Sequence, residues 1–379
     1  MKLLHTADLH IGKRVFGFSL LEDQRHALNE IVRIAHEQDI SAVLIAGDIY
    51  DKSVPAETAV SLLDDFLTAL LDTGAAVFLI AGNHDSPERL QFGSRILRER
   101  GLYIAGAYTG ETTRIRMADE HGPVDIVLLP YLRPAQARPY FEGQEIQTHE
   151  DAVRAALSGI PQEPGVRRVL LAHQFVTAAG EKPVLSESET PSVGGLDNVD
   201  VSAFDGFDYV ALGHLHGPQS MGRSTVRYAG SPLKYSFSES GHTKGAAIID
   251  LDKDGVRDIS FAPISALRDM RSLRGPMEEL IKNAIKSDDY LHVQLTDEDD
   301  IPDAMQRIRS VYPNTMHLSY DNSRARAAEL PLDTLPLEDM NPYEQFAAFF
   351  ELQNGRSLNE SGQSLIQSLL DKLDGEADA

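Results

Sequence analysis

The first twelve residues, MKLLHTADLHIG (Met1–Gly12), join an apolar run directly to two polar side chains, Asp8 and His10. Four later stretches repeat this arrangement. A buried strand that ends at a small residue delivers its next side chains to one edge of a sheet, so we expect the five polar groups to converge. The later apolar runs are Ala42–Ala46, Val77–Ala81, Arg168–Ala172 and Tyr209–Leu212, and the polar groups that follow them are Gly47–Asp51, Gly82–Asp85, His173 and Gly213–His216.

The residue types in these groups predict a site for two divalent cations. Two cations about 3.5 to 4 Å apart stabilise both the attacking and the leaving oxygen of a phosphate displacement. Asp48 is the best candidate for the bridging ligand, because a carboxylate has two oxygens whereas an imidazole offers one free lone pair. Mixed oxygen and nitrogen donors suit manganese, iron or zinc, and we favour manganese. The candidate ligands are Asp8, His10, Asp48, Asn83, His173, His214 and His216.

His84 is the residue that we assign to catalysis. If the amide oxygen of Asn83 binds a cation, the next imidazole faces the phosphate, where it donates a proton to the departing oxygen or stabilises its charge. Asp85 has two readings of equal weight: it orients the His84 ring, or it caps a helix that begins at Ser86-Pro87. Asp51 is similarly either a supporting group of the site or a turn residue.

Each group is a weak signal alone, and a lone histidine such as His173 is more often a core or surface residue. The order D-H, GDxxD, GNHD, H, GHxH along one chain argues against coincidence, and it resembles the calcineurin-like metallophosphoesterase superfamily. The segments that flank these groups narrow the resemblance to the SbcD family of bacterial nuclease subunits, from Met1 to about Leu373. These segments are Thr6–Gly12, Gly47–Asp51 and Tyr228–Glu239.

The resemblance implies a distribution of the ligands, a substrate and a partner. One metal would be held by Asp8, His10, Asp48 and His216, and the other by Asp48, Asn83, His173 and His214. The partner would be an SbcC-like ATPase, in a heterotetramer with two copies of each subunit and therefore with a homodimer of this chain. The complex would degrade double-stranded DNA ends from 3′ to 5′ and cut single strands and hairpins internally, in DNA repair, recombination and replication.

Composition adds four expectations. The chain of 379 residues has no cysteine, which argues against a disulfide-built secreted protein. No apolar run approaches the roughly 20 residues of a membrane span, so we expect no membrane association and a cytoplasmic location. The net charge of −23 opposes binding to a polyanion at long range. Tight DNA binding is therefore expected to need a partner.

The pattern of elements predicts an α/β nuclease domain at residues 1–263, with two sheets flanked by helices. Helices are expected near Asp23–Gln38, Ala56–Asp72 and Pro87–Arg100. The later strands, including Ala246–Leu251 and Arg257–Ala262, are expected to form a second sheet packed on the first. The stretches His149–Pro164 and Glu181–Asp200 read as excursions near the site.

Three further parts follow. Residues 264–322 predict a compact α+β capping domain, residues 323–341 a proline-broken linker, and residues 342–379 a helical tail. Apolar stripes usually pack on their own domain, but a small detached helical pair cannot bury a core alone. Docking of the tail on a partner is the better interpretation. Its expected anchors are Tyr343, Phe346, Phe349, Phe350, Leu365 and Leu369.

Three functions from different classes remain open. The first is a DNA nuclease subunit that works with an ATPase, since the chain has no ATP-binding P-loop of its own. The second is a phosphatase or phosphodiesterase for a small molecule or a phosphoprotein, which would need neither the capping domain nor the tail. The third is a noncatalytic bridging subunit, against which the complete set of candidate ligands argues.

Overall fold

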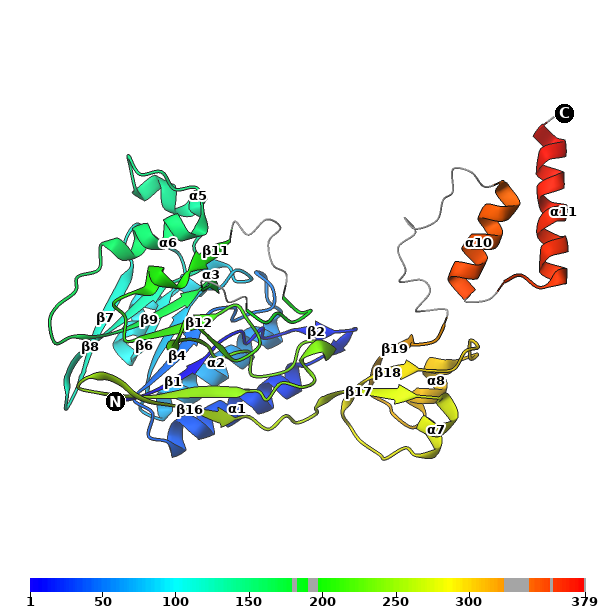
Figure 1. Ribbon diagram of the computed structural model, residues 1–379. Helices are drawn as coiled ribbons and strands as arrows, with labels where there is room; N and C mark the ends of the chain where they lie inside the picture. The colour runs from blue at the N-terminus through cyan, green and yellow to red at the C-terminus, as the bar shows by residue number, and fades with distance from the viewer. Residues whose placement is uncertain (179–182, 190–196, 324–340, 355–356, 378–379) are drawn as a thin grey trace. The chain divides into compact units, whose positions relative to one another are not determined.

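The computed structural model describes residues 1–178, 183–189, 197–323, 341–354 and 357–377 (Figure 1). The chain divides into two compact units, Met1–Met270 and Arg271–Ala379. The linker predicted at residues 323–341 lies almost entirely outside the described residues. Among the described residues, none of the helices has the length and apolar character that crossing a bilayer requires.

The first sheet of unit 1 has the strand order β16-β15-β1-β4-β5-β6. Four neighbouring strands are parallel: β1 (Lys2–Thr6), β4 (Ala42–Ala46), β5 (Ala76–Ile80) and β6 (Leu102–Ala105). The helix α1 (Leu21–Glu37) lies between β1 and β4 in the chain, α2 (Glu57–Asp72) lies between β4 and β5, and both bury their apolar stripes. Every residue of β4 is buried, as expected for a central parallel strand that is covered on both faces.

The expectation that residues 246–251 and 257–262 belong to the second sheet is wrong. They form β15 (Gly245–Asp252) and β16 (Gly255–Pro263), a hairpin at the edge of the first sheet. β15 pairs antiparallel with β1, and His5 lies opposite Ala247. Such a pairing joins residues about 240 positions apart, and no local sequence signal specifies it.

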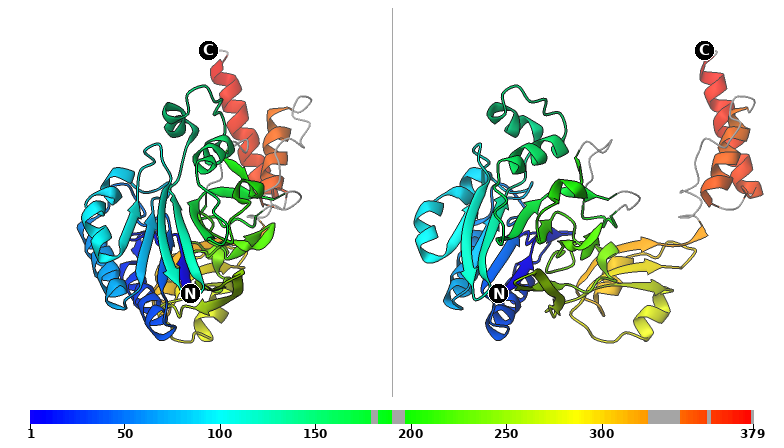
Figure 2. Two further views of the ribbon diagram at one scale, coloured as in Figure 1. Left: turned by 90° about the vertical axis from the view of Figure 1, so that its left-hand side faces the viewer. Right: turned by 60° about the vertical axis from the view of Figure 1, so that its left-hand side comes forward.

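The second sheet has the order β13-β14-β12-β9-β8-β7. Its strands are β7 (Thr113–Asp119), β8 (Gly122–Leu129), β9 (Arg167–His173), β12 (Tyr209–Gly213), β13 (Gln219–Met221) and β14 (Arg223–Tyr228). The inner faces of the two sheets share one buried cluster, in which Leu44 and Phe78 of the first sheet join Leu171 and Tyr209 of the second. Figure 2 shows these layers from two further sides. The α/β sandwich predicted from the sequence is therefore the observed architecture.

The stretch at residues 149–164, expected as an irregular excursion, begins instead with the helix α6 (His149–Ser158). Thr148 caps it, because the Asp151 backbone N–H donates to Thr148 Oγ1 at 3.1 Å while the Asp151 carboxylate accepts the Thr148 backbone N–H at 2.9 Å. This T-x-x-D capping box is readable in the sequence. The alanines of α6 join the core on the outer face of the second sheet, where α5 (Pro134–Ala137) also lies.

The helix expected at residues 87–100 is broken into α3 (Pro87–Gln91), α4 (Ser94–Leu97) and a short 3₁₀ turn. Gly93 stops it, because its φ of 74° lies in the left-handed region. The break leaves Phe92 and Ile96 85% and 76% exposed. Two short strand pairs complete unit 1: β2 (Arg14–Val15) with β3 (Phe18–Ser19), and β10 (Phe175–Thr177) with β11 (Asn198–Asp200).

Unit 2 contains a small α+β module and two helices of the tail. The module has a three-stranded sheet of β17 (Met270–Gly275), β18 (Tyr290–Leu295) and β19 (Thr315–Tyr320). The helices α7 (Met277–Lys282) and α8 (Ala304–Arg309) pack on it through a core that includes Leu291, Val293 and Ile308. The tail helices are α10 (Pro342–Asn354) and α11 (Glu360–Ala377).

Candidate metal centre

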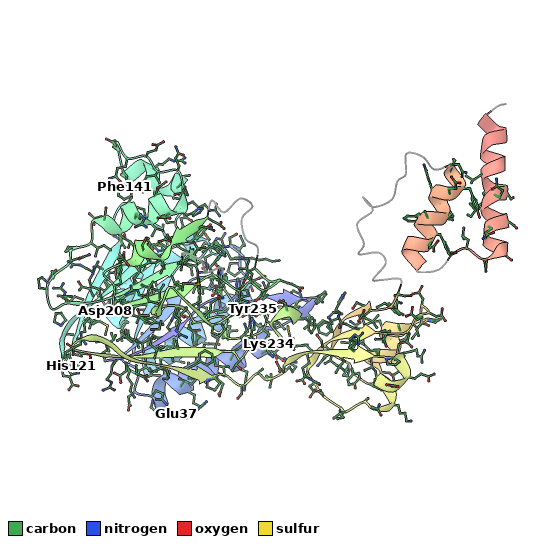
Figure 3. The ribbon with its side chains drawn as sticks, viewed as in Figure 1. Glu37, His121, Phe141, Asp208, Lys234 and Tyr235 are labelled. Carbon is green, nitrogen blue, oxygen red and sulfur yellow. The ribbon has the colours of Figure 1, made fainter. Side chains whose placement is uncertain are left out.

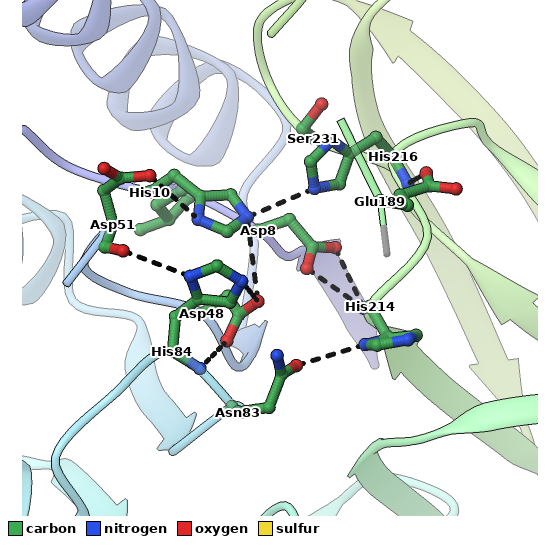
Figure 4. Close-up of polar contacts among 12 residues, drawn as sticks. Asp8, His10, Asp48, Asp51, Asn83, His84, Glu189, His214, His216 and Ser231 are labelled. Carbon is green, nitrogen blue, oxygen red and sulfur yellow. Dashed lines mark hydrogen bonds and ion pairs between the residues drawn. The ribbon is translucent and has the colours of Figure 1, made fainter. Parts of the chain in front are cut away.

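The five polar groups converge where parallel strands of the two sheets end (Figure 4). Asp8 and His10 follow β1, Asp48 follows β4, and Asn83 follows β5. From the second sheet, His173 is the last residue of β9, and His214 and His216 follow β12. The carboxyl ends of parallel strands meet at one edge of a sheet, and the packing of two sheets brings two such edges together.

One group of donor atoms surrounds His10. Its Nε2 atom lies 3.1 Å from Nε2 of His216 and 3.6 Å from Oδ2 of Asp48. Asp8, His10 and His216 also place donor atoms within 4.8 Å of one another. Ligands that bind one cation at about 2.1 Å lie roughly 3 to 3.5 Å apart, so these spacings fit a common cation.

The second group surrounds Asn83. Its Oδ1 atom lies 3.0 Å from His173 Nε2 and 3.1 Å from His214 Nδ1. Asp48 Oδ2 lies 3.4 Å from His173 Nε2, so this carboxylate reaches both groups of donors. The seven predicted residues thus come together, and Asp48 lies between the two sets. Two cations held here would stabilise the attacking and leaving oxygens of a phosphate ester.

The backbone at the site is strained. Among the described residues, seven that are not glycine have positive φ, and four of them are Asp8 (54°), His10 (43°), Asp48 (48°) and His214 (111°). A Cβ atom at Gly82 would lie 2.1 Å from Asp48 Oδ1, so only glycine fits there. Strain of this kind persists where the surrounding structure enforces it, and it clusters at functional sites.

The electrostatics also fit a cation site. Burial lowers the pKa of His214 to about 3 and the pKa of His10 well below its usual value, so both rings are neutral and able to ligate. Burial raises the pKa of Asp8 to about 7. Burial alone would raise the pKa of Asp48 too, but the neighbouring His173 holds it well below its usual value. Bound cations would compensate this buried negative charge.

His84 lies at the mouth of the site, with its side chain 42% exposed. Its Nδ1 atom lies 3.1 Å from the backbone oxygen of Asp51, and a carbonyl only accepts, so Nδ1 carries a proton. The other ring nitrogen, Nε2, lies 4.0 Å from Asp48 Oδ2. The ring therefore presents Nε2 beside the predicted bridging ligand.

Neither role suggested for Asp85 is the one that its carboxylate has in the structure. Oδ2 accepts the backbone N–H groups of Ile49 at 3.0 Å and Gly82 at 2.8 Å, and Oδ1 accepts that of Tyr50 at 3.0 Å. These hydrogen bonds of the carboxylate go to backbone N–H groups and not to the His84 ring, and α3 has no side-chain cap. Asp85 instead joins the loop that carries Asp48 to the loop that carries Asn83.

Other residues of the site were not singled out from the sequence. Tyr235, labelled in Figure 3, lies with its ring 5.5 Å from that of His10, and its hydroxyl donates to the backbone oxygen of Leu9. Nζ of Lys13 lies 2.8 Å from Asp51 Oδ1, so the Asp51 carboxylate forms an ion pair beside the site. Both contacts join positions far apart in the sequence or in different loops, and residue spacing alone carries no signal for them.

Comparison with known proteins agrees with this geometry. The calcineurin-like phosphoesterase family matches residues 1–218, and the type 5 capsule protein repressor C-terminal domain, SbcD_C, matches residues 266–354. The SbcD subunit of the nuclease SbcCD from Staphylococcus epidermidis is 33% identical over 324 residues, which are 84% of this chain and 85% of that protein.

Two solved structures share a distant likeness. GAP50, the anchor in the inner membrane complex of Plasmodium, gives a TM-score of 0.44 at 10% identity, covering 88% of this chain and 98% of its own. TT1561 of Thermus thermophilus gives a TM-score of 0.40 at 13% sequence identity, and the match covers 70% of this chain and 99% of the TT1561 chain.

The fold and the family match define the class: this chain is a calcineurin-like, metal-dependent phosphoesterase. Within that class it belongs to the SbcD family of nuclease subunits.

Proposed function

We propose that this chain is a two-metal DNA nuclease subunit. The observation that carries the proposal is the position of Asp48 between two sets of donors, His10 at 3.6 Å on one side and His173 at 3.4 Å on the other. Asp8, His10, Asp48 and His216 hold one cation, and Asp48, Asn83, His173 and His214 hold the other, with manganese as the metal that suits these donors best. His84 acts on the departing oxygen.

The substrate is DNA and the partner is an SbcC-like ATPase. The relative from Staphylococcus epidermidis bears the name of a subunit of SbcCD, and SbcD_C matches the part of the chain that follows the phosphoesterase domain. With the ATPase, the chain degrades double-stranded ends from 3′ to 5′ and cuts single strands and hairpins, in repair, recombination and replication in the cytoplasm. The partner supplies the DNA affinity that a net charge of −23 opposes.

The tail helices α10 and α11 supply the contact with that ATPase. They enclose a groove of about 330 Å³ lined by Phe346, Phe350, Leu358, Leu365 and Ile366. Phe346, Phe349, Leu365 and Leu369 remain exposed, with Leu365 at 60%. A helical pair that leaves these side chains in water can bury them by docking on an apolar surface of a partner. Tyr343 lies on the same helix as the phenylalanines.

Phe92 and Ile96 support the proposed homodimer. Phe92 follows α3 directly and Ile96 lies within α4, and both expose most of their surface to solvent. Two large exposed apolar side chains four residues apart in the sequence offer an isologous contact between two copies of this chain. With two ATPase subunits, such a dimer forms the heterotetramer.

The domain divisions are part of the proposal. Residues 1–263 form the nuclease domain, 264–322 the capping domain that selects DNA, 323–341 a linker and 342–379 the partner-binding tail. Truncation after Ser323 should therefore leave a folded, manganese-dependent enzyme that still nicks single-stranded DNA but no longer binds the ATPase.

The experiment compares a labelled DNA hairpin with p-nitrophenyl phosphate mono- and diesters, with manganese, with and without the ATPase, and with Asp48→Ala as the inactive control. Cleavage of the hairpin by the wild-type chain alone, stimulated by the ATPase and ATP, supports the nuclease. Turnover of the monoester with an intact hairpin would make the chain a phosphatase instead. If the Asp48→Ala variant still carried out these reactions, the proposed metal site would be contradicted.

A further inference from the structure

His216 has a second ring nitrogen that faces away from the metal centre. Its Nδ1 atom lies 2.8 Å from Ser188 Oγ, and the same hydroxyl oxygen lies 2.6 Å from Oε1 of Glu239. Glu239 is fully buried, and its other oxygen, Oε2, lies 2.6 Å from Nζ of Lys244. A chain of hydrogen bonds thus joins a buried ion pair to the imidazole.

The direction of each bond in this chain follows from the groups present. Nζ of Lys244 donates to the backbone oxygen of His216 at 2.8 Å, to Ser231 Oγ at 2.9 Å and to Glu239, which uses all three ammonium protons. Glu239 beside this cation is an ionised carboxylate, which only accepts hydrogen bonds. The single hydroxyl proton of Ser188 must therefore point to Glu239.

The direction at Ser188 fixes the protonation of His216. Because the Ser188 hydroxyl donates to Glu239, its oxygen is left to accept from the imidazole, which requires an Nδ1–H on that ring. The neutral ring consequently carries its lone pair on Nε2. That atom lies 3.1 Å from His10 Nε2, within the first group of candidate donors.

We infer that Ser188 and Glu239 are positioning residues that hold His216 in the tautomer able to bind a cation through Nε2. The inference rests on the proposed function, since it takes His216 as a ligand. The backbone of His216 is held by the same surroundings, because Glu189 Oε1 accepts its N–H at 2.5 Å and Lys244 donates to its carbonyl. The residue is thus fixed at its ring, its N–H and its C=O.

This arrangement also gives a role to a segment whose sequence resembles the SbcD family without containing a candidate ligand. Glu239 closes that segment, Tyr228–Glu239, and Ser188 lies in the stretch at residues 181–200 that was expected near the site. Carboxylates that orient metal-binding histidines through their second nitrogen are a general feature of metalloproteins. Here a serine hydroxyl is inserted between the carboxylate and the ring.

The test uses the full-length chain and one matched pair of serines. Ser188→Ala removes the hydroxyl that touches the ring. Ser236→Ala is the control, because Ser236 Oγ also contacts Glu239 Oε1, at 3.1 Å, whereas the hydroxyl that is hydrogen-bonded to His216 Nδ1 is that of Ser188. Ser188→Thr keeps a hydroxyl and serves as the rescue variant. Thermal unfolding midpoints establish that all three variants are folded.

Two measurements follow. In metal-free protein with ¹⁵N-labelled histidine, the ring shifts should show His216 protonated at Nδ1 in the wild type, in Ser236→Ala and in Ser188→Thr, with the Nε2–H tautomer gaining population in Ser188→Ala. In manganese titrations, Ser188→Ala should weaken one of the two sites by about 10- to 100-fold, the usual effect of removing such a partner. Ser236→Ala should stay within about twofold of the wild type.

His216→Ala separates this inference from the proposed function. If His216→Ala loses one manganese while Ser188→Ala keeps both the wild-type tautomer and the wild-type affinity, the positioning role is refuted and the metal site stands. If His216→Ala still binds two manganese ions, His216 is no ligand, and both the ligand set and the inference fail.

Discussion

Replacing Asp85 by alanine should destabilise the fold and the metal centre together. The carboxylate is buried and accepts three backbone N–H groups, those of Ile49 and Tyr50 in one ligand-bearing loop and that of Gly82 in the other. The bonds from Ile49 and Tyr50 join positions 36 and 35 residues apart in the sequence. Without them, the loop that carries Asp48 loses its two hydrogen bonds to the loop that carries Asn83, and the latter loop also loses the bond from Gly82 that shapes it.

The magnitude follows from the number of donors left without an acceptor. A buried donor that loses its partner costs about 1 to 3 kcal/mol, so three such donors give a range of about 3 to 9 kcal/mol. Water that enters the small polar space relieves part of this cost, which places Asp85→Ala near the lower end, at about 3 to 5 kcal/mol. Asp85→Asn keeps one oxygen that can serve the two N–H groups bound to Oδ2, so it should lose only about 1 to 3 kcal/mol.

Urea unfolding of the metal-free chain measures this loss, and a manganese titration of the folded variant measures the effect on the site. Asp51→Ala is the control, because Asp51 lies in the same loop but its carboxylate pairs with partly exposed Lys13, at 2.8 Å. It should lose less than about 1 kcal/mol. If Asp85→Ala were as stable as Asp51→Ala and yet inactive with both metals bound, Asp85 would be a catalytic residue and the reasoning would be wrong.

Three further predictions concern the site and the core. Asp48→Ala should bind no metal pair, whereas His10→Ala should keep one ion, as metal analysis after desalting will measure; two ions per chain in Asp48→Ala would place the bridge elsewhere. His84→Gln should keep both metals and its DNA affinity but cleave about 10²- to 10⁴-fold more slowly in single-turnover assays; near-normal cleavage would rule out its role. Burial lowers the pKa of His5 to about 3, so between that value and 6.5 the unfolded chain binds a proton that the folded chain does not, and stability falls as the pH falls through this window. Between pH 6.5 and pH 5, urea unfolding should show that the free energy of unfolding of the wild type falls by up to about 2 kcal/mol more than that of His5→Gln. An equal fall in both proteins would refute this prediction.

The sequence was a good guide to the strands and to the residues that follow them. Asp8, Asp48 and Asn83 could be placed at one edge because each follows an apolar run, and parallel strands end at a common edge. His173 was the least certain ligand from its local sequence. In the structure, His173 Nε2 lies 3.0 Å from Asn83 Oδ1, because β9 ends beside the same edge.

The errors arose where distant parts of the chain determine the outcome. Nothing near β15 and β16 specifies β1 as their neighbour, so their sheet was assigned wrongly. Both roles expected for Asp85 come from its neighbours in sequence, His84 on one side and Ser86-Pro87 on the other, whereas its partners in the structure include two amides in a different loop. The helix α6 was a different kind of error, because its capping box was present at Thr148 and Asp151 but was outweighed by the polar composition of the stretch.

The pairing of β1 with β15 has a consequence for the order of folding during synthesis. β1 emerges from the ribosome first, but its partner on one side is β15, which ends at Asp252. Until then the strand that leads to Asp8 and His10 has an open edge, and long-range pairings of this kind form slowly. The nascent chain is therefore expected to complete the sheet beneath its metal centre only after Asp252 has been made. A phosphoesterase that folds in this way stays inactive until β15 has been made.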